Sequence, residues 1–151
     1  NGKNIGDKWH TDSRYLGGKK LIGLSYIGTL MLDDFTEKNA STFYIPKSHL
    51  SLNKPKKDGK YKHKTLIGKK GSMVLFDSGL WHRGGKPTAE SRWSLGFYYG
   101  PWWMKPYFRF TDMLGLKNMK KLNKNVKKLF HYYSNPPKNI DERIGTVVRD
   151  Y

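Results

Sequence analysis

The stretch GSMVLFDSGLWHRGGKPTAESRWSLGFYYG, residues 71–100, decides how this chain folds. Short runs rich in apolar, β-branched and aromatic residues predict three strands, over Ser72–Asp77, Leu80–Arg83 and Arg92–Tyr99. An Asp-Ser-Gly turn joins the first two strands, and Gly-Gly-Lys-Pro-Thr forms a loop before the third. This stretch therefore predicts antiparallel β-structure made of short strands.

The tetrapeptide Trp-His-Thr-Asp at residues 9–12 carries side chains that can bind a metal ion. Side chains alternate between faces in an extended chain, so His10 and Asp12 point the same way. Two ligands at this spacing can take adjacent coordination positions on one metal ion, and His82 on a facing strand can supply a third ligand. Two imidazoles and one carboxylate form the ligand set of non-heme Fe(II) oxygenases. Arg92, ten residues after His82, offers a guanidinium fork suited to holding a carboxylate.

Five pieces of the sequence, in this order, resemble the phytanoyl-CoA dioxygenase family of Fe(II)/2-oxoglutarate oxygenases. The resemblance runs from about residue 9 to residue 99. The pieces are the tetrapeptide at 9–12, Leu32-Asp-Asp, Asn39-Ala-Ser-Thr-Phe-Tyr-Ile-Pro-Lys-Ser-His49, Gly71-Ser-Met-Val-Leu-Phe-Asp77, and His82-Arg-Gly-Gly followed by Arg92. A His-x-Asp tripeptide alone is common by chance, whereas five ordered pieces are specific.

The resemblance implies an all-β core folded as a double-stranded β-helix, or cupin-like jelly roll. Many short strands separated by turn signals are typical of such a sandwich or barrel. Further along, apolar residues at three- and four-residue steps predict a helix over Leu116–Tyr132. We therefore expect a single dioxygenase domain over residues 1–151, with the β-helix core at 1–100 and a helical C-terminal extension at 101–151.

The start of the chain differs from the family pattern. Family members carry a long amino-terminal part before the first metal ligand, whereas here His10 lies nine residues after Asn1. We therefore expect the chain to lack the amino-terminal part of the domain. This motivates one alternative function, a non-catalytic jelly-roll binding module or inactive fragment.

The resemblance implies that His10, Asp12 and His82 hold Fe(II), with 2-oxoglutarate as cofactor and O2 as co-substrate. The reaction would hydroxylate a small molecule and release succinate and CO2. Relatives that halogenate have a small residue at the position of Asp12, so the carboxylate favours hydroxylation. Family members act on acyl-CoA thioesters, osmolytes, phosphonates and other metabolites, and the sequence selects neither a substrate nor an oligomeric state.

Three residues are expected to bind 2-oxoglutarate. Arg92 matches the position of the family's arginine, which binds the distal carboxylate of the cofactor. Ser94 lies on the same strand face and completes an Arg-x-Ser pair of the kind that binds this carboxylate in related oxygenases. Thr29, in the apolar segment over residues 21–32, can also reach it.

The composition limits the environment and the partners of the protein. No cysteine is present, which excludes disulfides and thiolate metal sites. The sequence has no apolar run of roughly 18 residues, which a membrane span needs, and no secretory signal. The cytoplasm is therefore the default compartment.

The formal net charge is +17, which attracts anions such as nucleic acids or phosphorylated substrates. The lysines are scattered over residues 54–70 and 117–128, without a nucleic-acid-binding motif around them. This pattern favours solvated lysines on loops and a small-molecule substrate, with a mild preference for an anionic one. A nucleic-acid-directed oxygenase is the less favoured alternative.

Overall fold

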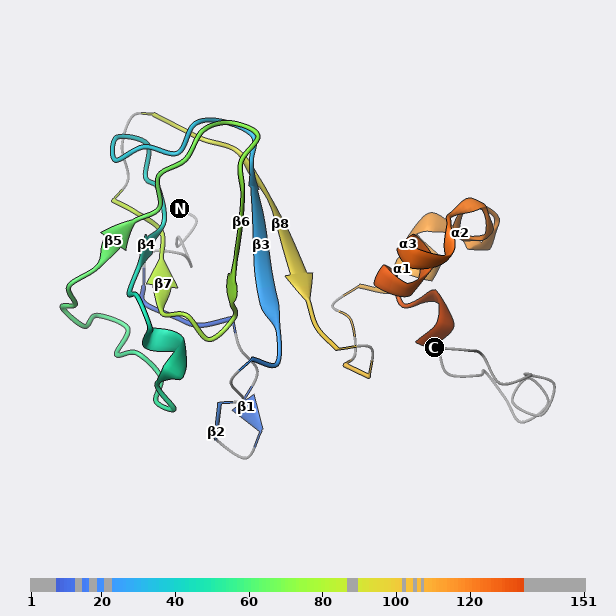
Figure 1. Ribbon diagram of the computed structural model, residues 1–151, viewed down its shortest axis with the longest axis horizontal. Helices are drawn as coiled ribbons and strands as arrows, with labels where there is room; N and C mark the ends of the chain where they lie inside the picture. The colour runs from blue at the N-terminus through green and yellow to red at the C-terminus, as the bar shows by residue number, and fades with distance from the viewer. Residues whose placement is uncertain are drawn as a thin grey trace, which may run out of the picture. The chain divides into compact units, whose positions relative to one another are not determined.

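The structure is a computed structural model that describes residues 8–12, 15–16, 19–20, 23–86, 90–101, 103–104, 106 and 108–134 (Figure 1). It divides into a β-rich unit, Asn1–Tyr99, and a helical unit, Gly100–Tyr151. Small antiparallel sheets dominate the first unit, and short helices make up the described part of the second. The expected β-rich core is present.

A three-stranded antiparallel sheet with the order β6-β3-β8 forms one layer of the β-rich unit (Figure 1). The central strand β3 spans Tyr26–Met31, and its neighbours are β6, Met73–Asp77, and β8, Ser94–Tyr99. Two of the strands predicted from residues 71–100 therefore flank a strand from much earlier in the chain. In this register Gly28 lies opposite Leu75 and Phe97.

A second antiparallel sheet, with the order β5-β4-β7, forms a separate layer (Figure 1). Its strands are two residues long: β5 is Lys64–Thr65, β4 is Phe43–Tyr44 and β7 is His82–Arg83. The extended segment expected at residues 9–12 pairs through one isolated bridge, between His10 and His82. A small hairpin of β1, Tyr15–Leu16, and β2, Lys19–Lys20, completes the described strands.

Side chains from both layers meet between the two sheets. The ring of Phe76 on β6 lies 5.4 Å from that of His82 on β7, edge to face. Met31 and Phe35 are almost completely buried, and the guanidinium of Arg92, just before β8, donates to the carbonyl of Ala40, just before β4. Two facing antiparallel sheets are compatible with a double-stranded β-helix, and that finer assignment remains a prediction.

Residues 110–115, also expected to be helical, contain helix α1, Phe110–Leu114, whereas the one helix predicted over residues 116–132 is divided into shorter pieces. The other described helices of the helical unit are α2, Leu116–Lys121, α3, Lys124–Leu129, and a 3-10 turn, Tyr132–Ser134. The break falls at Leu122, which is extended, and at Asn123, whose side chain accepts a hydrogen bond from the backbone N–H of Val126. Asparagine is a strong N-cap and starts a new helix there. None of the helices in the described part of the chain has the length and apolarity to cross a membrane.

Substitution of Gly85, which follows β7, should reveal how closely the chain segments pack there. A Cβ atom on Gly85 would lie 2.3 Å from the carbonyl oxygen of Ser41, so backbone atoms would have to move. We expect Gly85→Ala to lower the free energy of unfolding by roughly 1–3 kcal/mol in urea denaturation. Gly96→Ala is the matched control, because a Cβ on Gly96 would meet nothing within 4 Å. An equal loss in both variants would contradict this account.

Candidate metal centre

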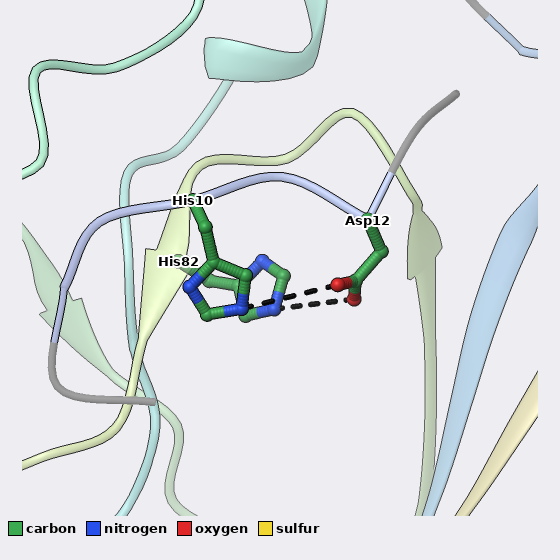
Figure 2. Close-up of side chains that lie close together, drawn as sticks. All are labelled: His10, Asp12 and His82. Carbon is green, nitrogen blue, oxygen red and sulfur yellow. Dashed lines mark ion pairs between the residues drawn. The ribbon is translucent and has the colours of Figure 1, made fainter. Parts of the chain in front are cut away.

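The backbones of His10 and His82 form the framework of the candidate site. The N–H of each residue donates to the carbonyl of the other, and both hydrogen bonds are 3.0 Å long. Residues that exchange two hydrogen bonds in an antiparallel pair lie directly opposite each other, so their side chains share a face. The two imidazole rings accordingly lie 4.3 Å apart between centroids, as Figure 2 shows.

A buried polar network holds the backbone of Asp12. The N–H of Asp12 donates to the carbonyl of Ser78 at 2.8 Å, and the N–H of Ser78 donates to the carbonyl of Ser25. The hydroxyls of these serines lie 2.6 Å apart, and the Tyr98 hydroxyl donates to that of Ser25. Ser25 and Ser78 are buried, so the network fixes the turn after β6 and with it the position of Asp12.

The ring nitrogens of both histidines have fixed roles. Nδ1 of His10 lies 2.8 Å from the carbonyl oxygen of Lys8, and Nδ1 of His82 lies 2.9 Å from that of Leu80. A carbonyl can only accept, so Nδ1 carries a hydrogen in each ring, and Nε2 has a free lone pair when the ring is neutral and an N–H when it is protonated. Both Nε2 atoms face the carboxylate of Asp12, at 3.3 Å from His82 and 3.9 Å from His10 (Figure 2).

The three side chains shift one another's ionisation. Burial disfavours the charged carboxylate of Asp12, but the hydrogen bond to His82 and the positive charges of His82 and His10 outweigh it and lower the Asp12 pKa. Burial likewise disfavours the imidazolium of His82, and the hydrogen bond and charge of Asp12 outweigh it and raise the His82 pKa. The site therefore favours an ionised carboxylate beside a cation.

The arrangement fits a divalent metal ion. Ligand atoms from His10, Asp12 and His82 all lie within 4.8 Å of one another. Hydrogen bonds from Nδ1 to backbone carbonyls are the outer-shell contacts that orient metal-binding imidazoles. A bound divalent cation would replace the proton that His82 otherwise shares with Asp12. Two imidazoles and one carboxylate suit iron and similar transition metals.

Arg92 lies between the two layers and is partly used by the fold. Its Nη2 donates to the carbonyl of Ala40 at 3.0 Å and lies 3.4 Å from the hydroxyl of Thr42. Its guanidinium carbon is 4.0 Å from the centroid of the Phe35 ring. Within the described part of the chain, the buried Nε has no hydrogen-bond partner. Burial lowers the pKa of this guanidinium.

Ser94 and Thr29 share one face of the first sheet. In the pairing of β3 with β8, Thr29 lies opposite Gly96, and Ser94 lies opposite the buried Met31. Alternation places Thr29 and Met31 on the same face, and hence Ser94 with them. Ser94 is exposed and Thr29 is half-buried. Their contribution to cofactor binding remains a prediction.

Sequence reasoning did not single out Tyr44. This residue lies directly opposite His82 in the pairing of β4 with β7, so its side chain is on the same face as the His82 imidazole. The only sequence signal was its place in the piece over residues 39–49. Tyr44 comes to the site through the pairing of β4 with β7, two strands that lie far apart in the sequence.

Together, the β-rich unit and the converging His, Asp and His side chains define a β-protein with a candidate metal centre of the two-histidine, one-carboxylate type. The chain belongs to the phytanoyl-CoA dioxygenase (PhyH) family, whose model matches residues 1–93. This membership confirms the resemblance seen in the sequence and relates the chain to the Fe(II)/2-oxoglutarate oxygenase superfamily.

Two curated relatives from mycobacteria are similar to this chain. Both are uncharacterised proteins, one from Mycobacterium tuberculosis strain H37Rv and the other from Mycobacterium bovis. Each is 27% identical over 115 residues, which cover 74% of this chain and 41% of the relative. The chain therefore spans less than half the length of the relatives that it matches.

In the metal-free protein, the Asp12–His82 pair should stabilise the fold within a limited pH range. The pKa of Asp12 is lower in the folded protein than its unfolded value of 3.8. Its contribution to the free energy of unfolding is therefore present above pH 3.8 and is lost as the pH falls through the folded pKa. The pKa of His82 is higher in the folded protein than its unfolded value of 6.5. Its contribution to the free energy of unfolding is therefore complete below pH 6.5 and is lost as the pH rises through the folded pKa.

Urea unfolding with a chelator present measures this effect. The difference in unfolding free energy between the unmodified chain and Asp12→Asn should shrink as the pH rises from 6.5, the unfolded value of His82, through its raised folded pKa. Asp58→Asn, at an exposed carboxylate, is the control and should show a constant difference. If the difference in unfolding free energy between Asp12→Asn and the unmodified chain does not change with pH, the ion pair contributes nothing to stability.

Proposed function

We propose that this chain carries the catalytic centre of an Fe(II)- and 2-oxoglutarate-dependent dioxygenase that hydroxylates a small molecule and releases succinate and CO2. The observation that carries the proposal is the convergence of two Nε2 atoms on the Asp12 carboxylate, with both Nδ1 atoms tied to carbonyls. Family membership supports the same chemistry.

In this proposal His10, Asp12 and His82 hold the metal, which supplies oxidation of an unactivated C–H bond with O2 and 2-oxoglutarate. The residues around them keep the ligands in place. The carbonyls of Lys8 and Leu80 hold the rings in the tautomer that can bind metal. Phe76 packs against His82 and excludes water from that side of the imidazole.

Arg92 is proposed to bind the distal carboxylate of 2-oxoglutarate. A buried N–H donor without an acceptor costs about 1–3 kcal/mol, and Nε of Arg92 is such a donor in the described part of the chain. A carboxylate oxygen would remove this cost and gain a charge-assisted bond. The face of Thr29 and Ser94 offers room nearby, because a Cβ at Gly96 would meet no atom of the described residues within 4 Å.

We further propose that the two facing sheets are the halves of a double-stranded β-helix core over residues 1–100, within one domain over 1–151. Asp12 would supply a carboxylate ligand where relatives that halogenate have a small residue, which favours hydroxylation. The excess of lysine is compatible with an anionic small-molecule substrate.

An anaerobic titration tests the proposal. Fe(II) and then 2-oxoglutarate are added while the visible absorption is followed, and a charge-transfer band should require both additions. Asp12→Ala should abolish the band, because one of three ligands is lost. Arg92→Ala should raise the 2-oxoglutarate concentration needed by roughly 10- to 100-fold, since a charge-assisted hydrogen bond is lost.

The control variant is Asp58→Ala, which removes an exposed carboxylate and should leave the band unchanged. Near-ultraviolet circular dichroism of each variant separates loss of a ligand from loss of the fold. Absence of the band in the folded, unmodified chain, and again in a chain extended at its amino terminus, would overturn the dioxygenase proposal. The non-catalytic binding module would then be favoured.

A further inference from the structure

A cavity of about 530 Å³ lies on the face of the second sheet opposite the metal centre. Alternation explains this position, because Trp9 and Arg83 neighbour His10 and His82 along the chain and point to the other face. The lining residues are Trp9, Lys57, Asp58, Gly59, Lys60, Tyr61, His63 and Arg83. The cavity is thus distinct from the candidate metal centre, although the same chain segments build both.

Aromatic rings and one guanidinium form the base of the cavity. Trp9 is only 3% exposed, and the rings of Tyr61 and His63 each lie 5.6 Å from it. The guanidinium carbon of Arg83 lies 5.1 Å from the Trp9 ring and 5.4 Å from the ring of Phe43. Because Trp9 itself is covered by these neighbours, the ring surface that can face a ligand belongs to the half-buried Tyr61 and the exposed His63. It lies beside a guanidinium that is held in place by stacking on Trp9 and Phe43.

The loop that borders the cavity has its shape fixed before any ligand binds. The N–H of Gly59 donates to the carbonyl of Lys56, and the N–H of Lys56 donates to the hydroxyl of Tyr61. The ring of Tyr61 lies so close to Gly59 that a Cβ there would be 2.3 Å from it. The N–H of Trp9 ties the loop to the sheet through the carbonyl of Lys57. Preorganisation of this kind lowers the entropic cost of binding.

The charge of the cavity is positive. Lys57, Lys60 and Arg83 contribute three cations, and Asp58 is the acidic residue among the lining side chains. The carboxylate of Asp58 lies 3.6 Å from the ammonium of Lys8, which offsets its charge. The lining residues therefore attract an anion, and ammonium and guanidinium groups both suit phosphate oxygens.

We propose that this cavity binds a small molecule in which a flat ring carries a phosphate group, a mononucleotide being the simplest example. The ring would stack on the aromatic base, and the phosphate would lie against Lys57, Lys60 and Arg83. The volume is within the usual range of about 300–1,000 Å³ for small-molecule sites. This site goes beyond the proposed oxygenase chemistry and requires no metal.

Calorimetry of the full chain with AMP, in the presence of a chelator, tests the proposal. AMP should bind at one saturable site, roughly tenfold more tightly than either inorganic phosphate or adenosine, because each lacks one of the two recognised parts. Lys57→Glu combined with Lys60→Glu should weaken AMP binding by roughly tenfold or more.

Lys62→Glu is the matched control, because this exposed lysine belongs to the same loop but does not line the cavity. Lys62→Glu makes the protein more negative, as the double variant does, but it lies outside the cavity. For each unit of charge changed, it should therefore weaken AMP binding by less than about twofold. Three results would overturn the proposal: no AMP binding, equal affinity for AMP and inorganic phosphate, or equal weakening per charge by Lys62→Glu. A fourth result would also overturn it: a single-stranded oligonucleotide that binds and is not displaced by AMP would assign the basic residues to a general anion-binding surface.

Discussion

The two backbone hydrogen bonds exchanged by His10 and His82 are the constraint on which the candidate site depends. They join the first described segment of the chain to β7, a strand some seventy positions later. Because the paired residues are directly opposite, both imidazoles share a face without any specific side-chain contact. Asp12 follows two positions after His10 on the same side, and the carbonyl of Ser78 fixes its backbone.

The ionisation of Asp12 and His82 follows from the short distance between their side chains. The contact that keeps Asp12 ionised also raises the affinity of His82 for a proton. Metal binding requires a neutral imidazole, so a proton and a metal ion compete for the same nitrogen. A divalent cation would neutralise the carboxylate more fully than one proton does, and both Nε2 atoms lie close enough to share it. The three side chains are therefore arranged as a candidate cation site before any metal binds.

Local features of the site could be predicted from the sequence, and non-local ones could not. Strand alternation predicts that His10 and Asp12 share a side, and turn residues predict β6 and β8, because both depend on neighbours in the chain. The position of Tyr44 opposite His82 depends on the register of distant strands, which local periodicity does not encode. The helix break at Asn123 was missed because the apolar spacing continues through it, whereas the cap interaction stops the helix.

Packing on the other face of the same segments also helps to position the candidate metal ligands. Trp9 is 3% exposed and stacks with Arg83, and burial of a large aromatic side chain contributes on the order of 2–3 kcal/mol. A shift of one residue in the pairing would turn Trp9 inward and His10 outward, and would lose both contacts. The aromatic packing around Trp9 therefore also selects the register that brings the two imidazoles together at the candidate metal centre.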